Sequence, residues 1–359
     1  MTAPTPDPRF LEQVVEPKAF LRDAMAATNV AAMGALLKRL PIVSENDFYF
    51  DPENPTAGWR PGYLHWVPLG KDRGNAGRVQ LASRPENPLA ERAINAMEAV
   101  IEMMRLRELK QKPNSPAPKS AREAVQRYFD IPALPELARL PRSHEVRVRA
   151  RELAEKVQLT IEFDRETREF LVQLRDHGMG QTPARIHRTF LSLGESDKGD
   201  KPYLIGVFGQ GGSSAFMAST YSWCVSRRDP AISGGDNSLG WSVVKRVLPN
   251  NHRGQYYAYL AASPDGQVPA FPAAVADEVG FTHGTLFTHL KYGFSGGGGS
   301  AILRTLFQSI NHVLYNPVMP FTTRIGGTSA TIWGNAYRLS TATAKGRTAQ
   351  DKTLPVANV

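Results

Sequence analysis

The chain has 359 residues, of which 42% are hydrophobic and 21% charged, a composition that excludes general disorder and allows a sizeable core. The formal charge of +9 favours anionic partners such as nucleotides or nucleic acid. The single cysteine, Cys224, excludes an intramolecular disulfide and a multi-cysteine metal site.

Two further absences in the sequence concern location. No apolar run approaches the roughly 18 residues that a membrane helix needs. The proline-rich start lacks the apolar segment of a secretory signal. A cytoplasmic protein without a membrane partner is therefore predicted.

Residues 1–76 are predicted to form a helical and aromatic-rich N-terminal extension. Apolar residues from Phe10 to Leu40 recur at helical spacing, which predicts one or two helices that end before Pro41. Ser44 to Arg73 combines turn residues with many aromatics. This pattern predicts an ordered segment that packs on the same chain or on a second subunit.

The next segment is predicted to be mainly helical. Residues 78–82 are compatible with a short strand, and Pro88 is predicted to open a helix that runs to about Lys110. After a proline-studded loop, further helices are predicted within 121–140 and 143–157. The part from about 105 to 157 is rich in arginine and lysine. It lies between the two segments that carry candidate chemistry below, and we call it the basic insert.

Strands are predicted to dominate the remainder. Alternating residues from Leu159 to Leu174 predict a hairpin that turns near 165–167. Four more strands are predicted at 220–227, 241–247, 256–262 and 285–292. Helices followed by paired strands, without regular alternation, favour an α+β sandwich over a doubly wound sheet.

Residues 77–295 are accordingly predicted to be one domain, and residues 296–359 to follow it. The last segment begins with a four-glycine run that predicts a flexible hinge, whether natural or an engineered linker. A helix over 301–315 and a polar tail from Ser340 are predicted after it.

Two segments carry candidate chemistry on carboxylate and amide groups. The helix from Pro88 has an acidic and amide-bearing side with Glu91, Asn95, Glu98 and Glu102, although an ordinary solvated helix face explains such a stripe by itself. Farther along, Asp176 leaves a predicted strand and is followed by glycines two and four positions later. Such a turn lets the backbone approach a flat ligand while the carboxylate points into a pocket.

A glycine-rich loop follows in the stretch LIGVFGQGGSSAF, which ends at Phe216. Its glycines at 206, 209, 211 and 212 precede a predicted helix start at Ser213. A loop of this kind can present backbone N–H groups to phosphate oxygens, although a tight packing turn is the alternative. The Walker A pattern is absent, and the loop lacks the context of a dinucleotide fingerprint.

Together these segments resemble the GHKL ATPases, the family of DNA gyrase, heat-shock chaperones, histidine kinases, MutL and the MORC proteins. The matching residues are Glu91, Asn95, Glu98 and Ala99 in the helix; Asp176, Gly178 and Gly180 in the turn; Gly206, Phe208, Gly209, Gly211, Ser214, Ala215 and Phe216 in the loop; and the strand HGTLFTHLK from His283 to Lys291. Two departures are glutamate at position 98, where many members have aspartate, and the long separation between the helix and the turn.

The resemblance implies the two-layer α/β sandwich called the Bergerat fold, with ATP and Mg²⁺ as ligands. Asp176 would accept a hydrogen bond from the adenine amino group, with support from Thr285. Asn95 would bind Mg²⁺ through its amide oxygen. Glu91, one helical turn before it, would orient or deprotonate the attacking water.

The remaining implied contacts surround the phosphates. Gly178, Gly180, Gly206, Gly209, Gly211 and Gly212 would line the nucleotide with their backbone. Thr189 to Lys201 would form a lid, with Lys198 as the candidate phosphate contact and Ser192 and Ser196 as weaker ones.

The predicted function is slow, Mg²⁺-dependent ATP hydrolysis that drives a conformational change or homodimerisation, acting on DNA or RNA through the basic insert in DNA processing or defence. The alternative is a protein-remodelling ATPase similar to the heat-shock chaperones. A histidine kinase is less well supported, because its phosphoacceptor helix would precede the ATP domain. A non-hydrolysing nucleotide sensor is disfavoured by Glu91.

Overall fold

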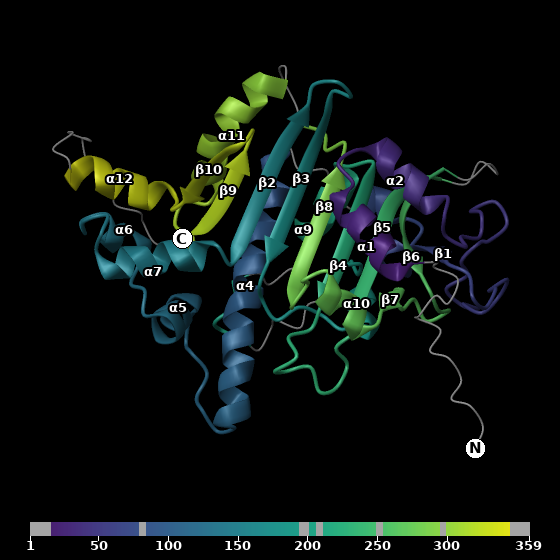
Figure 1. Ribbon diagram of the computed structural model, residues 1–359, viewed down its shortest axis with the longest axis horizontal. Helices are drawn as coiled ribbons and strands as arrows, with labels where there is room; N and C mark the ends of the chain where they lie inside the picture. The colour runs from purple at the N-terminus through teal and green to yellow at the C-terminus, as the bar shows by residue number, and fades with distance from the viewer. Residues whose placement is uncertain are drawn as a thin grey trace.

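The computed structural model describes residues 16–78, 84–193, 201–205, 211–248, 254–294 and 299–344. These residues form one ten-stranded mixed sheet with helices on both faces, which confirms the α+β class (Figure 1). The strand order is β1-β6-β5-β4-β8-β3-β2-β9-β10, with β7 paired to β5. The strands are β1 His65–Pro68, β2 Val157–Asp164, β3 Glu169–Asp176, β4 Tyr221–Arg227, β5 Leu239–Val247, β6 Tyr256–Ala261, β7 Ala270–Phe271, β8 Gly284–Leu290, β9 Phe321–Ile325 and β10 Thr328–Ile332.

The helices vary widely in length, and α4 with 26 residues extends along much of the sheet. They are α1 Pro17–Ala26, α2 Val30–Leu37, the 3₁₀ helix η1 Leu69–Lys71, α3 Asn75–Arg78, α4 Glu86–Gln111, α5 Ala121–Phe129, α6 Leu134–Leu137, α7 Glu145–Ala154, α8 Pro183–Thr189, α9 Gly211–Met217, α10 Ala273–Glu278, α11 Gly299–Val313 and α12 Asn335–Ala344. Pro88 lies in the first turn of α4, where its missing N–H breaks no helical hydrogen bond. None of the helices that the structure describes combines the length and hydropathy of a membrane span.

The centre of the sheet brings distant segments into register. Strand β3 pairs with β2 in the predicted hairpin and with β8 on its other side. Asp176 lies opposite Thr285, which in turn lies opposite Ser226 of β4. Three polar side chains from three strands therefore meet at one end of the sheet.

Each face of the sheet has its own core because alternate residues of a strand point to opposite sides. On one face, Met97 and Val100 of α4 share a core with Val172 and Leu174 of β3. On the other face, α1, α2 and α10 cover apolar side chains that include Trp223 and Trp241. In Figure 1, α4 and α9 lie behind the sheet, whereas α1 and α10 lie in front of it. This cover adds a third layer over part of the predicted two-layer sandwich.

The three segments that the sequence analysis separates all contribute to this sheet. From 1–76, β1 pairs antiparallel with β6. From 296–359, β9 pairs parallel with β2 and forms a hairpin with β10. These C-terminal strands were not predicted, although the paired glycines at 326 and 327 form the positive-φ turn that a tight hairpin requires.

Substitution of Phe20 in α1 tests how much the N-terminal segment contributes to the free energy of unfolding. Its ring is 2% exposed and lies 5.5 Å from the Trp241 ring and 6.3 Å from the Trp223 ring. We expect Phe20→Ala to lower the free energy of unfolding by about 3–5 kcal/mol, because it leaves a cavity among aromatic rings. Chemical denaturation measures this change, with Tyr63→Ala at an exposed position as the control. Equal stabilities for the two variants would show that α1 contributes little to the fold.

Candidate functional site

A cavity of about 300 Å³ lies between α4 and the sheet. Its apolar lining is Ala96, Ala99, Leu106, Leu174, Met179, Phe190, Leu204 and Phe287. Its polar and charged lining includes Arg92, Asn95, Glu98, Glu102, Asp176, Gln181, Arg185, Arg188, Lys201, Ser213, Arg228 and Thr285. The fold thus brings together Asn95, Asp176, Gly180 and Thr285, four of the residues that the sequence analysis selects.

Asp176 is a buried carboxylate at the end of β3, only 3% exposed. Its Oδ1 accepts a hydrogen bond from the Gly178 backbone N–H at 2.9 Å. Burial raises the pKa of the Asp176 carboxyl to about 6, against the lowering effects of the Arg175 charge and of hydrogen bonds from Gly178 and Thr285. Thr285 is equally buried, and its Oγ1 lies 3.0 Å from the Ser226 Oγ.

The two glycines after Asp176 permit two close backbone approaches. A Cβ on Gly178 would lie 2.6 Å from the backbone of Ala99 in α4, and a Cβ on Gly180 would lie 1.8 Å from the Arg227 carbonyl oxygen. Gly180 also has a φ of +60°, which disfavours other residues. Met179 N–H donates to the Ala99 carbonyl at 2.9 Å. Gly178 therefore lets the turn pack against α4, and Gly180, which lines the cavity, lets it pack against β4.

Helix α4 supplies the facing wall. Asn95 lines the cavity and is exposed to solvent. Glu91 is also exposed and lies one turn closer to the helix start, outside the lining that the described residues form. Partial burial raises the pKa of the Glu91 carboxyl above its ordinary value, which makes the carboxylate a stronger base.

The rest of the acidic side of α4 is buried and has a structural task. Glu98 is 2% exposed and accepts a hydrogen bond from the Ile205 backbone N–H. Glu102 is 4% exposed and forms an ion pair with Lys201 at 2.8 Å. These carboxylates therefore hold residues 201–205, a segment that begins with Lys201, the last residue of the predicted lid. A solvated face explains Glu91 and Asn95 but not these two side chains.

The glycine loop and the lid are described only in part. Lys198, Ser196, Gly206 and Gly209 lie outside the described residues. Gly211 and Gly212 open α9, and the following Ser213 lines the cavity. At the start of the lid, the Ser192 Oγ donates to the Thr189 carbonyl at 3.2 Å.

The arginines of the cavity were not predicted from the sequence. Arg185 and Arg188 come from α8, Arg228 follows β4, and Arg92 lies on α4. Arg92 precedes Asn95 by three positions, a helical spacing that places both on one side. That spacing was the available signal, but the arginine belongs to neither the apolar nor the acidic stripe of the helix.

A metal ion at this site would be coordinated mainly by oxygens of a bound phosphate ligand, and only in small part by protein side chains. No group of three or more His, Cys, Asp or Glu side chains in the described ranges could hold a metal. The exposed Asn95 amide oxygen is a hard donor of the kind that Mg²⁺ accepts together with phosphate oxygens and water. The residues present therefore fit Mg²⁺ delivered with a phosphate ligand, and they do not form a metal cage.

The arginines and lysines of the basic insert are largely engaged within the chain. Thirteen lie between residues 105 and 157: Arg105, Arg107, Lys110, Lys112, Lys119, Arg122, Arg127, Arg139, Arg142, Arg147, Arg149, Arg151 and Lys156. Eight of them have side-chain hydrogen bonds to groups of this chain, for example Arg107 to Asp229 at 2.7 Å and Arg149 to Asp130 at 2.7 Å. The other five have no such side-chain bond among the described residues: Lys112, Lys119, Arg139, Arg142 and Lys156. The charge of the insert is thus mostly used in folding contacts.

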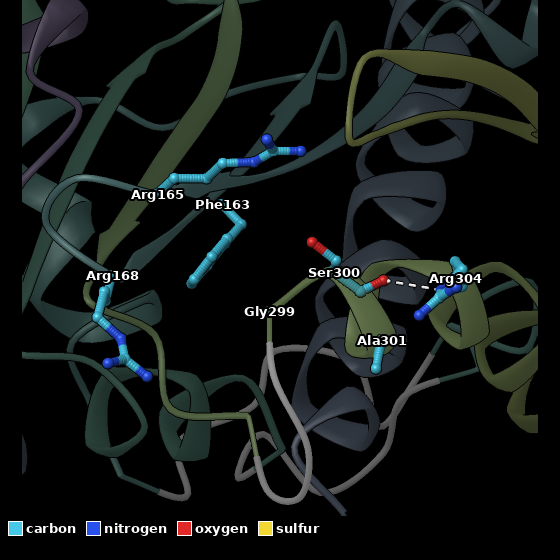
Figure 2. A pocket seen from close by; sticks show the side chains of 7 residues that line it. All are labelled: Phe163, Arg165, Arg168, Gly299, Ser300, Ala301 and Arg304. Carbon is cyan, nitrogen blue, oxygen red and sulfur yellow. Dashed lines mark hydrogen bonds between the residues drawn. The ribbon is translucent and has the colours of Figure 1, made fainter.

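A second hollow, of about 540 Å³, lies at the turn of the β2–β3 hairpin (Figure 2). Arg165 and Arg168 extend from the hairpin, and Arg304 lies across from them on α11, where its Nε donates to the Ser300 carbonyl at 3.2 Å. All three arginines are exposed, so they form a solvated surface. The cavity beside α4, with its buried polar groups, is the better candidate.

Comparison with protein-family models and with curated protein sequences gives no match.

The raised pKa of Asp176 predicts a pH-dependent stability. Because its pKa is about 6 in the folded chain against 3.8 ordinarily, the folded state loses stability as pH rises between those values, by about 3 kcal/mol in all. Asp176→Asn removes this cost and keeps an oxygen for the Gly178 N–H. We expect its stability relative to the original protein to rise by roughly half of that amount from pH 5 to pH 7.5.

Denaturant titrations at both pH values measure this difference, in which the titration of all other groups cancels. Asp47→Asn, at an exposed position, is the control and is expected to show no such trend. A stability difference that stays constant with pH for Asp176→Asn would contradict the assignment of a buried, ionising carboxyl.

Proposed function

We propose that the cavity between α4 and the sheet binds ATP with Mg²⁺ and hydrolyses it slowly. The observation that carries this proposal is the buried Asp176 carboxylate, which lines the cavity together with Asn95 from α4. The motif resemblance and the separate geometry of the turn both support it. The Bergerat fold is part of the same proposal, since the central strands and α4 supply the elements that this fold uses.

The adenine would occupy the part of the cavity beside Asp176. A carboxylate that is held by the Gly178 N–H and by Thr285 keeps further acceptor capacity for an amino group. Leu174 and Met179 line the same cavity and offer apolar surfaces to a flat base. One polar anchor among apolar walls orients a base and selects for an exocyclic amino group.

The phosphates would lie toward Asn95 and the cavity arginines. Arg185 and Arg188 are exposed cations of the lining, suited to attract a polyphosphate from solvent. A bound Mg²⁺ would offset phosphate charge during hydrolysis, held by the Asn95 amide oxygen. The exposure of Asn95 leaves room for the water that such a site retains.

Glu91 would orient the attacking water and accept its proton. Its position one turn from Asn95 places both groups on the same side of α4. The raised pKa favours proton acceptance by the carboxylate in water. A single exposed base without further rigid support is compatible with slow turnover.

The output of the ATP cycle would be a conformational change or dimerisation. Residues 201–205 begin with Lys201, the last residue of the predicted lid, and they are held to α4 by Glu98 and Glu102. A lid that closes on nucleotide would therefore pull on a segment already fixed to the nucleotide-binding helix. Glu102 and Lys201 both line the cavity, so their ion pair lies where bound phosphates would change its surroundings.

Two substitutions separate binding from hydrolysis. We expect Glu91→Ala to lower the hydrolysis rate by about 100-fold or more while ATP affinity stays close to the original. We expect Asp176→Asn to raise the dissociation constant of ATP by roughly tenfold to hundredfold, because a charge-assisted hydrogen bond is lost. Phosphate release and calorimetry measure the two quantities.

Glu162→Ala, at an exposed position of β2, is the matched control for the loss of a glutamate. Undiminished hydrolysis by Glu91→Ala would exclude its role as the base. Failure of the unsubstituted protein to bind ATP in the presence of Mg²⁺ would exclude the proposed function as a whole.

The salt dependence of DNA binding tests whether the ATP cycle acts on nucleic acid. If only the five cations of the insert without a side-chain hydrogen bond among the described residues contact phosphates, log K for duplex DNA is expected to fall against log salt with a slope of about −4.5. If all thirteen do so, the slope approaches about −12. Gel-shift titrations distinguish these values, and an absence of salt-sensitive DNA or RNA binding would remove nucleic acid as the partner.

A further inference from the structure

Arg92 is a buried cation in the wall of the nucleotide cavity. It lies on α4, lines the cavity together with Asn95, and is only 5% exposed. Its guanidinium carbon lies 4.0 Å from the Phe287 ring centre and 4.4 Å from that of Phe216. Two aromatic rings, one from the sheet and one from α9, therefore hold this side chain in place.

Part of the hydrogen-bonding capacity of Arg92 is not used among the described residues. Its Nε and Nη2 are buried and have no hydrogen-bond partner there. Among the described residues, no carboxylate forms an ion pair with it. The titratable groups whose charges act on it are Cys224 and Tyr292, and burial raises the pKa of both, so they are neutral at ordinary pH.

A buried charge in this state is costly. Removing a guanidinium from water without an anion or hydrogen-bond acceptors to replace the hydration destabilises the fold. Contact with the two ring faces offsets only part of that cost, because the rings supply no acceptor for the N–H groups. Because Arg92 lines the cavity, a ligand there can supply the missing acceptor once the buried N–H groups of the side chain turn toward it.

We propose that Arg92 binds a phosphate group of the nucleotide from within the cavity wall. This inference rests on the proposed function and extends it by assigning an anion contact on α4 itself. The planar guanidinium is suited to phosphate oxygens, which accept its N–H groups in pairs. Ser213 at the start of α9 and Asn95 line the same cavity and complete a polar surface beside it.

The position of Arg92 distinguishes it from the other cavity cations. Arg185 and Arg188 are exposed, so solvent screens their interaction with a ligand. Lys201 already pairs with Glu102. Arg92 is both desolvated and without an anion among the described residues, and for this reason its contact with phosphate contributes more to affinity than theirs.

The test compares ligands with and without phosphate. Calorimetry with Mg²⁺-ATP and with adenosine is performed on the unsubstituted protein, Arg92→Met and Arg92→Lys. We expect Arg92→Met to raise the dissociation constant of ATP at least about tenfold and to leave that of adenosine unchanged. Arg92→Lys is expected to restore part of the ATP affinity, because it keeps the charge without the paired donors. Arg304→Met, which makes the same change at an exposed position, is the control for net charge.

The following results would count against this role or against the proposed function. An unchanged ratio of ATP to adenosine affinity in Arg92→Met overturns the phosphate contact. An equal loss of affinity for both ligands assigns Arg92 to cavity shape instead. If the unsubstituted protein binds neither ATP nor adenosine, the proposed function itself is excluded. If the unsubstituted protein and Arg92→Met bind ATP equally well, only the role of Arg92 is excluded. Thermal unfolding of each variant without ligand confirms that the comparison is made on folded protein.

Discussion

The contact between the turn after Asp176 and the middle of α4 determines the geometry of the site. Met179 donates to the Ala99 carbonyl, and the absence of a side chain at Gly178 allows this approach. The same turn continues through Gly180 against the Arg227 carbonyl, so it is fixed to the sheet as well. Asp176 thereby loses contact with water yet faces a cavity. A larger residue at either glycine would move the helix or the turn and would close or widen the space between them.

Helix α4 has three sets of side chains, which contact the core, the segment from residue 201 to 205 and the cavity. Met97 and Val100 belong to the core, whereas Glu98 and Glu102 hold residues 201–205. Arg92, Asn95, Ala96 and Ala99 line the cavity. Because one helix carries all three sets, a displacement of α4 by a ligand at Asn95 would also move the segment that Glu102 holds. Under the proposed function, this shared helix would couple nucleotide binding to the predicted lid.

The elements that the sequence predicts best are those with strong local patterns. The β2–β3 hairpin shows alternation, α4 shows helical spacing, and the turn from Asp176 to Gly180 has glycines where a Cβ would collide with backbone. The β9–β10 hairpin was missed because its short strands follow a polar pattern, and the burial of Glu98 was missed because its partner lies more than a hundred positions away in the chain. The environment of Arg92 could not be predicted either, because only the fold brings Phe216 and Phe287 next to it.

The two buried charges of the cavity impose opposite demands on a ligand. Asp176 is an acceptor that lies in a desolvated site, and Arg92 is a donor in another part of the same lining. Each costs stability while the cavity holds only solvent, and the two side chains do not form an ion pair with each other in the described part of the chain. A ligand that relieves both must present hydrogen-bond donors at one end and negative charge at the other, joined by a body that tolerates apolar walls. An adenine nucleotide has this polarity, whereas a free base or a free phosphate would satisfy only one of the two groups. Under the proposed function, bound nucleotide would therefore stabilise the fold, since it would add a hydrogen-bond donor for Asp176 and an anion for Arg92.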